Sequence, residues 1–333
     1  MKEAMFYEPL EDLRIRCNLC RHQCLIIEGK RGICGVRENN KGILYSLVYG
    51  KSISHGVDPI EKKPLYHLYP GSFSLSLATV GCNFRCLHCQ NYQISQEFQG
   101  NILGNDFPPE KVVALAKEYR CKSISYTYTE PTIFFEYAFD TAKLAHEKGI
   151  KNVFVTNGYI ASEAIEKISP FLDAANIDLK SFRKEFYRKI CGADLAEVLD
   201  SIEIFKKLEI WIEITTLVIP NQNDSDEELR EIAEFIKNLG PEVPWHISAF
   251  YPTYKLIDQP RTPVTTLRRA RDIGIEAGLK YVYEGNVSSE AENTYCHKCG
   301  RLIIERRGFH VRKNNIINSR CPYCQSLIDG VGM

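Results

Sequence analysis

The chain has 333 residues, of which 44% are hydrophobic and 25% are charged, a composition typical of a globular protein with an ordinary core. Its 42 basic and 42 acidic residues cancel, which argues against a general electrostatic attraction to nucleic acid or to acidic membranes. No apolar signal region opens the sequence, and no apolar run is long enough to cross a bilayer. We therefore expect a soluble, cytoplasmic protein without membrane contacts.

Thirteen cysteines stand out, and eleven of them fall into three compact groups with the spacing of metal ligands. In a cytoplasmic chain of this size, such groups indicate metal sites rather than a disulfide framework. The other two, Cys121 and Cys191, are interpreted as small buried hydrophobic residues.

The first group lies near the start of the chain and has the spacing C-x2-C-x3-C-x9-C. Four thiolates suit a closed zinc site or an auxiliary iron–sulfur cluster, and the regular ferredoxin spacing is missing. We favour zinc and keep the cluster as the alternative. The ligands would be Cys17, Cys20, Cys24 and Cys34.

The segment 58–72, DPIEKKPLYHLYPGS, follows and carries several charged and aromatic residues. It could line the mouth of a site or bind a partner, and a solvated loop is the alternative.

Strands and helices then alternate along most of the chain. Strands are expected at 73–80, 122–128, 151–158, 174–179, 211–219 and 245–250. Helices are expected near 108–120, 132–148, 162–172, 183–208 and 263–277, with another that begins at a capping box of Ser225 and Glu228. Strands followed by helices imply parallel pairing, because parallel neighbours need a crossover. The pattern predicts an α/β fold that is either doubly wound or curled into an open barrel.

The second cysteine group lies in GCNFRCLHCQN (81–91), directly after the first of these strands. Ligand sites of parallel sheets collect at that end of the strands. A closed four-iron–four-sulfur cluster has four protein ligands, so the three thiols of Cys82, Cys86 and Cys89 would leave one iron open. An open position allows a metal centre to bind and activate a substrate.

The third group is CHKC…CPYC, two C-x2-C pairs separated by twenty-one residues. Each pair presents two thiolates, and together they complete a tetrahedron, as in zinc ribbons; rubredoxin-type iron is the alternative. The ligands would be Cys296, Cys299, Cys321 and Cys324. The chain would thus divide into an N-terminal four-cysteine module with its lead-in (1–70), a central domain (71–290) and a zinc-ribbon-like module (291–333).

The motif C-x3-C-x2-C after the first strand of a (βα)6 pattern resembles the radical S-adenosylmethionine superfamily. The resemblance implies a partial (βα)6 barrel whose three cysteines hold a 4Fe-4S cluster. The open iron is chelated by S-adenosylmethionine, which is cleaved to methionine and a 5′-deoxyadenosyl radical that abstracts hydrogen from a substrate.

Other segments support this resemblance. YTYTEPT (126–132) stands where the superfamily binds the methionine amino group, and VTNG (155–158) and IDLK (177–180) resemble segments around the ribose and carboxylate in glycyl-radical-enzyme activases. A helix-start carboxylate at Glu130, a salt-bridged strand end at Asp178 and a core histidine at His246 are the structural alternatives. The cofactor-binding residues implied are His88, Gln90, Thr129, Glu130, Asn157, Asp178, Lys180 and His246.

From the N-terminal CxLCxxxC to WHISAFYPTYK (245–255), the chain resembles the radical enzymes of the AmmeMemoRadiSam system, a sister group of the pyruvate formate-lyase activating enzymes. This implies a protein substrate or partner and an electron donor of the flavodoxin or ferredoxin kind. A small metabolite is the alternative substrate. Zero net charge argues against RNA, and the open three-cysteine site argues against a non-catalytic metal-binding module.

Overall fold

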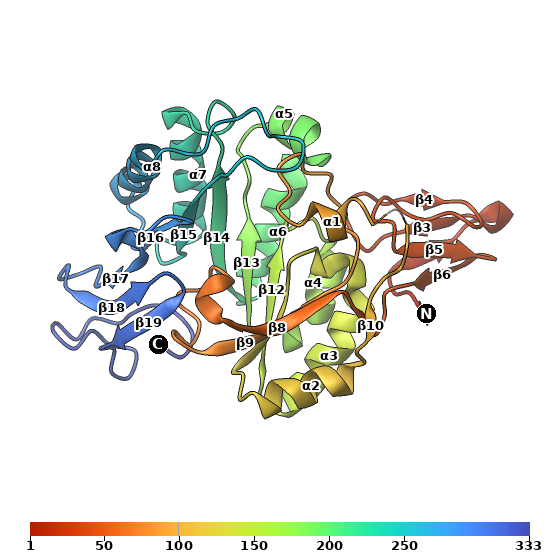
Figure 1. The fold of residues 1–333 in the computed structure, drawn as a ribbon, viewed down its shortest axis with the longest axis horizontal. Coiled ribbons are helices and arrows are strands. Elements are labelled where there is room, and N and C mark those ends of the chain that lie inside the picture. Colours follow the sequence, from red (N-terminus) through yellow and green to blue (C-terminus); the bar gives the residue numbers. More distant parts are fainter. Residues whose placement is uncertain (99) are drawn as a thin grey trace.

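The computed structural model describes residues 1–98 and 100–333, and an eight-stranded sheet forms its centre (Figure 1). The strand order is β16–β15–β14–β13–β12–β11–β9–β8. All neighbours from β9 to β16 are parallel, and β8 pairs antiparallel with β9 at one edge. The strands are β8 (Ser54–Pro59), β9 (Phe73–Ala78), β11 (Ser123–Tyr126), β12 (Lys151–Thr156), β13 (Ala174–Asp178), β14 (Trp211–Val218), β15 (Trp245–Ala249) and β16 (Val282–Gly285).

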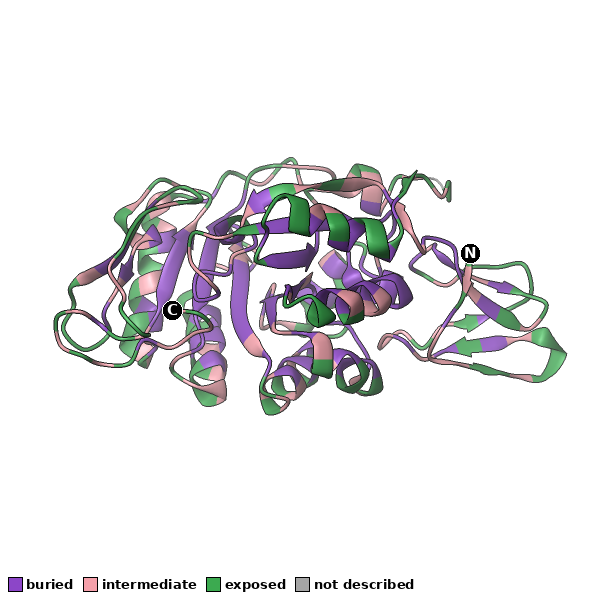
Figure 2. Ribbon diagram, turned by 90° about the horizontal axis from the view of Figure 1, so that it is seen from below, coloured by how far each residue is buried: buried purple, intermediate pink, exposed green. Residues whose placement is uncertain are grey.

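Helices connect the parallel strands, and the strands themselves are largely buried (Figure 2). The longer helices are α2 (Pro109–Glu118), α3 (Phe135–Glu147), α4 (Ser162–Ile168), α6 (Leu195–Lys207), α7 (Asp226–Leu239) and α8 (Val264–Ala277). Short turns of helix are α1 (Tyr92–Ser95), α5 (Lys184–Phe186), the π-helical η5 (Tyr187–Cys191), η1 (Glu11–Leu13), η2 (Ile60–Lys62), η3 (Pro131–Phe134), η4 (Ser169–Phe171) and η6 (Glu290–Glu292). The predicted cap of α7 is present, since the Ser225 hydroxyl accepts from the Glu228 amide at 3.3 Å.

The partial barrel and all six predicted strands are confirmed, but two strands of the sheet were missed. The β8 sequence SHGVDP contains glycine, aspartate and proline, which are depleted in strands and tolerated here because β8 is an edge. β16 is only four residues long and lacks a clear alternating pattern. β8 also lies within the range 1–70 that the sequence assigned to the N-terminal module and its lead-in.

The N-terminal module projects at one end of the long axis (Figure 1). A buried ion pair joins it to the barrel: the Arg37 guanidinium lies 2.9 Å from Glu136 of α3, whose carboxylate also accepts from the Met5 amide at 2.7 Å. Its two small sheets contain β1 (Lys2–Glu3), β6 (Ile43–Ser46) and β5 (Arg37–Asn40), and β2 (Tyr7–Pro9), β3 (Ile15–Cys17) and β4 (Leu25–Ile26); β7 (Lys51–Ser52) pairs with β10 (Asn105–Asp106).

The C-terminal module lies at the opposite end and is also tied to the barrel by a buried arginine (Figure 1). Arg306 donates to the Tyr66 carbonyl at 2.9 Å and to the Thr294 hydroxyl at 2.6 Å, and it lies 3.6 Å from the Glu61 carboxylate. The module consists of β17 (Thr294–Tyr295), β18 (Leu302–Arg307) and β19 (His310–Asn314).

A buried polar network inside the barrel anchors the segment 58–72. The Glu213 carboxylate of β14 accepts from the backbone amides of Tyr66 and His67 at 2.9 and 2.8 Å and from His246 Nε2 at 2.6 Å. The His67 ring is within 2.6 Å of both the Tyr283 hydroxyl and the Asp329 carbonyl, so it also links β16 to the C-terminal tail. Among the described helices, none is both long and apolar enough to span a bilayer.

The His67 network predicts an acid-sensitive stability. Burial lowers the pKa of His67 from 6.5 to about 4. Between these two pH values, His67 is protonated in the unfolded chain and neutral in the folded chain. The stability that neutral His67 contributes is therefore fully present above pH 6.5 and is lost as the pH falls toward 4. Between pH 6.5 and 5, the wild type should lose about 2 kcal/mol of unfolding free energy more than His67→Gln in urea titrations.

The exposed His146 supplies the control for this titration. His146→Gln should keep the wild-type pH dependence, and equal slopes for His67→Gln and the wild type would contradict the prediction.

Candidate active site

The loop 81–91 connects β9 to α1 and carries the three central thiols. Its backbone is fixed by η5, because the Arg85 and Leu87 amides donate to the carbonyls of Cys191 and Ile190 at 2.7 and 3.0 Å. Asn91 ties the other end of the loop to the barrel by donating to the Tyr128 carbonyl at 2.7 Å. The loop is thus held on both sides without help from a ligand.

Two of the three sulfur atoms of this loop have a hydrogen-bond partner in the loop or in α1. The Cys82 sulfur accepts from the Phe84 amide at 3.4 Å, and the Cys89 sulfur lies 3.1 Å from the Ser95 hydroxyl. The three central sulfurs do not all lie within 4.8 Å of one another in the described part of the chain. Three cysteines of one loop line one cavity, and this set of ligands suits a four-iron cluster in which one iron stays open.

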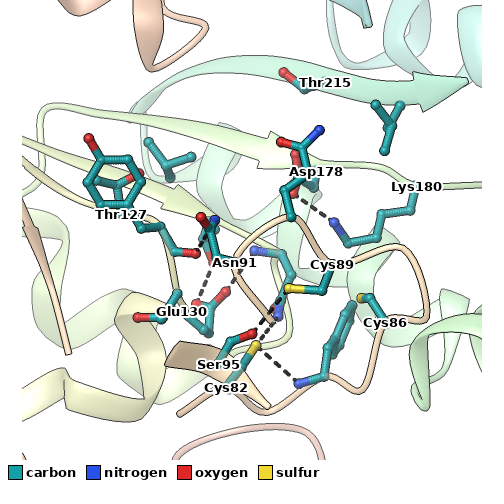
Figure 3. Close-up of a pocket in the computed structure, with 18 of the residues that line it drawn as sticks. Cys82, Cys86, Cys89, Asn91, Ser95, Thr127, Glu130, Asp178, Lys180 and Thr215 are labelled. Carbon is teal, nitrogen blue, oxygen red and sulfur yellow. Dashed lines mark hydrogen bonds and ion pairs between the residues drawn. The ribbon is translucent and has the colours of Figure 1, made fainter. Parts of the chain in front are cut away.

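A cavity of about 490 Å³ opens above the three thiols at the carboxyl ends of the strands (Figure 3). Side chains from β12, β13, β14, β15 and the loops after β9 and β11 line it. Of the residues predicted from the sequence, the structure places these in the lining: Cys82, Cys86, Cys89, His88, Gln90, Thr129, Glu130, Asn157, Asp178 and Lys180.

Glu130 joins the ends of two neighbouring strands. One carboxylate oxygen accepts from the amide of Thr132 at 3.0 Å and from the Thr156 hydroxyl at 2.7 Å, and the other accepts from the Asn157 amide at 2.8 Å. Burial raises the pKa of Glu130, while these hydrogen bonds oppose the rise. The carboxylate therefore also fixes the shape of the cavity wall.

Asp178 and Lys180 form an ion pair of 2.7 Å at the end of β13 (Figure 3). Although burial opposes protonation, the attraction of Asp178 raises the pKa of Lys180 well above its ordinary value. Lys180 thus brings a permanent positive charge to the cavity next to the cysteine loop.

His88 brings an unpaired polar group to the same loop. Its ring is buried, its Nδ1 atom has no hydrogen-bond partner among the described residues, and burial lowers its pKa to about 3. A buried polar atom without a partner is costly, so this nitrogen is suited to bind a ligand in the cavity.

The segment 58–72 contributes Lys62 and Lys63 to the lining. The sequence analysis named this segment but neither of these two residues. The Asp58 carboxylate contacts Lys62 and Lys63 at 2.7 and 2.8 Å and accepts from the Tyr128 hydroxyl at 2.5 Å. Burial lowers the pKa of Lys63 to about 8 against the attraction of Asp58. Tyr128 has a φ of 65°, an uncommon left-handed conformation for a tyrosine, and such strain often marks functional sites.

Several further lining residues were missed in the sequence, for different reasons. Asn91 lies two residues after Cys89, and Thr215 and Leu217 share one face of β14, so loop proximity and alternation were available signals. Phe309 reaches the cavity from the hairpin of β18 and β19, and no local pattern indicates such a contact. The missed residues include Lys62, Lys63, Asn91, Ser95, Thr127, Tyr128, Thr215, Leu217, Ser248, Asn286 and Phe309.

His246 is the one predicted cofactor residue that does not line the cavity in the described part of the chain. It lies two residues before Ser248 on the same face of β15, deeper in the barrel, and bonds to Glu213. Its ring packs against those of Tyr66 and Tyr283, with centroids 4.7 and 5.2 Å away. The structure therefore gives His246 the role of a satisfied core histidine.

The C-terminal cysteines are arranged for one metal ion. The sulfurs of Cys296, Cys299, Cys321 and Cys324 all lie within 4.8 Å of one another, with pairs at 3.6 and 3.8 Å. Tetrahedral zinc with bonds of about 2.3 Å places its sulfurs about 3.8 Å apart. This geometry fits a single tetrahedral ion.

Comparison with known proteins agrees with this site. Residues 76–236 match the model of the radical SAM superfamily, where SAM is S-adenosylmethionine. The chain is 50% identical over 333 residues to protein MJ0808 of Methanocaldococcus jannaschii, which is uncharacterised, and the match covers 99% of each chain. A second protein of that organism, provisionally named a glycyl-radical enzyme activating enzyme, is 26% identical over 70% of this chain and 87% of its own.

A radical SAM methyltransferase from Sphaerobacter thermophilus has a similar fold, with a TM-score of 0.52, 16% identity and coverage of 71% of each chain. Residues 76–236 therefore form a radical SAM domain, and the chain is an enzyme of the radical SAM type. It belongs to one family with MJ0808, since the two chains are 50% identical over 99% of their lengths.

The C-terminal site predicts one tightly bound metal ion per chain. Removing one of four ligands should lower metal affinity sharply, and the few apolar residues of the module cannot replace the metal. Cys321→Ser should lose that ion in elemental analysis and expose the module to protease, whereas Ser319→Ala should not. Full metal content and protease resistance in Cys321→Ser would refute the site.

Proposed function

We propose that Cys82, Cys86 and Cys89 hold a 4Fe-4S cluster and that the cavity binds S-adenosylmethionine beside it. The observation that carries the proposal is that three cysteines of one loop line the 490 Å³ cavity, one ligand short of a closed cluster. When bound, this group supplies the electron that cleaves S-adenosylmethionine and starts hydrogen abstraction.

In this proposal, the chain's own residues bind, orient and shield the cofactor. The free His88 Nδ1 and the charged Lys180 are suited to polar groups of the cofactor, with Asp178 fixing the lysine. Glu130 and Asn157 shape the wall that Thr129 and Gln90 also line. The buried aromatic ring of Phe84 adds an apolar surface to the lining beside the thiols.

The central test replaces the loop thiols one at a time. Cys82→Ala, Cys86→Ala and Cys89→Ala should each reduce cleavage of S-adenosylmethionine under dithionite by at least about 100-fold, because each loses a cluster ligand. Cys121→Ala, which removes a buried thiol outside the cavity, is the control and should cleave normally. Normal cleavage of S-adenosylmethionine in the three loop variants would contradict the assignment of these cysteines as cluster ligands.

The substrate is proposed to be a protein, and the enzyme to belong to the radical enzymes of the AmmeMemoRadiSam system. The activating-enzyme name of the second relative supports a protein substrate. The cavity volume lies in the range of small-ligand pockets, but it must hold cluster and cofactor as well. Little room then remains for a free metabolite, which favours a segment projecting from a larger partner.

The rim of the cavity supports the same interpretation. Four lining residues are exposed and come from four separate segments: Lys62, Gln90, Asn286 and Phe309. The aromatic side chain of Phe309, 43% exposed at the mouth, is suited to contact a partner's surface. The proposal includes a flavodoxin- or ferredoxin-like electron donor, a cytoplasmic location and zinc in the C-terminal site.

A fractionation experiment separates the substrate classes. The purified enzyme, S-adenosylmethionine and dithionite are combined with either the desalted protein fraction or the small-molecule filtrate of a cell extract, and 5′-deoxyadenosine is measured. Stimulation by the protein fraction that protease abolishes and ribonuclease leaves intact is expected. Stimulation by the filtrate would favour a metabolite, and sensitivity to ribonuclease would favour RNA.

A further inference from the structure

The cysteine loop has an outer face that does not border the cavity. Arg85 and Leu87 alternate with residues that line the cavity, but in the described part of the chain neither belongs to the lining. The amides of Arg85 and Leu87 bond to η5, and the Leu87 carbonyl accepts from the Lys255 amide at 3.0 Å. The loop, α5 with η5, and the segment around Lys255 therefore form one continuous surface behind the cluster ligands.

Two other sides of the loop are already occupied. On one side lies the cavity, where cofactor and substrate are proposed to bind. On another lies the N-terminal module, since a Cβ atom on Gly81 would lie 2.7 Å from the Cys34 carbonyl oxygen and Arg85 donates to the Ile33 carbonyl. The four cysteines of that module line one small pocket: Cys17, Cys20, Cys24 and Cys34. The outer face remains open to solvent, because Arg85 and Lys255 are exposed.

The outer face carries more positive than negative charge. Its segments 84–91, 184–192 and 251–258 contain five exposed basic residues and two exposed acidic residues, Glu185 and Asp258. Glu185 lies 3.3 and 3.2 Å from two of the basic side chains and compensates one of them at most. The next acidic residue along the chain, Asp194, caps α6. The five basic residues are Arg85, Lys184, Arg188, Lys189 and Lys255.

This positive surface indicates the kind of partner that would bind there. The charges of the whole chain cancel, so the excess is local, and a local excess attracts and orients a partner of opposite charge. A protein bound on the outer face would stand next to the backbone of the cluster ligands without entering the cavity. A substrate must enter the cavity to meet the radical, whereas electron transfer requires only a short distance to the cluster. The position therefore suits a protein that delivers electrons.

We propose that this basic outer face is the docking surface of an acidic one-electron carrier protein. The inference rests on the proposed function, which includes a flavodoxin- or ferredoxin-like donor, and it adds where that donor binds. The reduced carrier loses one electron and the oxidised cluster gains it, and no atom is transferred. In a flavodoxin, the flavin hydroquinone anion becomes the neutral semiquinone. Because the donor docks behind the loop, it and a substrate at the cavity mouth can be bound together.

The test reverses the charge of the outer face in the full-length, cluster-loaded enzyme. Arg188→Glu/Lys189→Glu/Lys255→Glu changes three exposed side chains that do not line the cavity in the described ranges. Binding of oxidised flavodoxin and of oxidised ferredoxin is measured by calorimetry at low salt. At least one carrier should bind the wild type, and the variant should bind it at least about tenfold more weakly, because attraction becomes repulsion.

The matched control makes the same change of charge elsewhere on the surface. Lys143→Glu/Lys148→Glu/Lys167→Glu alters three exposed lysines of α3 and α4 or their ends, and it should bind the carrier like the wild type. A second readout is the ratio of 5′-deoxyadenosine formed with reduced carrier to that formed with dithionite, which needs no docking surface. This ratio should fall in the outer-face variant, and in the wild type it should fall as the salt concentration rises.

Unchanged binding in the outer-face variant, an equal loss in the control variant, or a wild type that binds neither carrier would overturn the proposal. Transfer RNA that binds the wild type more tightly than either carrier, and is lost in the same variant, would assign the surface to RNA instead. If the triple variant does not fold, Lys255→Glu alone should weaken carrier binding. Because the calorimetry uses oxidised proteins without S-adenosylmethionine, its result does not depend on whether the enzyme cleaves the cofactor.

Discussion

The parallel pairing of β9 through β16 is the constraint on which the site depends. Parallel strands all end at the same edge of the sheet, so the loops after them converge there. The cysteine loop follows β9, Glu130 follows β11, Asn157 follows β12, and Lys180 follows β13. Residues separated by about a hundred positions therefore meet in one cavity, and no single loop could supply this set.

Buried charged pairs then fix the two terminal modules on this barrel. Arg37 with Glu136 joins the N-terminal module, and Arg306 with Glu61 joins the C-terminal one. Such pairs add little net stability, but loss of one partner leaves a buried charge and costs about 3–5 kcal/mol. They therefore favour one orientation of each module. In that orientation, Cys34 lies against Gly81 at the start of the cysteine loop, and Phe309 reaches the cavity.

Local patterns in the sequence predicted the alternating strands and helices and part of the lining, because they encode strands, caps and metal-ligand spacing, whereas the family resemblance implied the partial barrel. The six strands appeared as apolar runs, and Cys82, Cys86 and Cys89 appeared through their spacing. Depth inside the barrel is not encoded locally, so His246 was placed at the cofactor although it bonds to Glu213 below the cavity. Contacts between distant segments, such as that of Phe309, depend on how the modules pack, and no pattern in one segment reports them.

The most direct measurement of the central claim is electron–nuclear double resonance on the reduced enzyme with S-adenosylmethionine labelled with 15N at its amino group. An open iron on the loop of Cys82, Cys86 and Cys89 predicts a hyperfine coupling between the labelled nitrogen and the cluster, absent in Cys86→Ala. Bound S-adenosylmethionine without such a coupling would contradict the account, since it would show that no iron at the floor of the cavity is open to the cofactor.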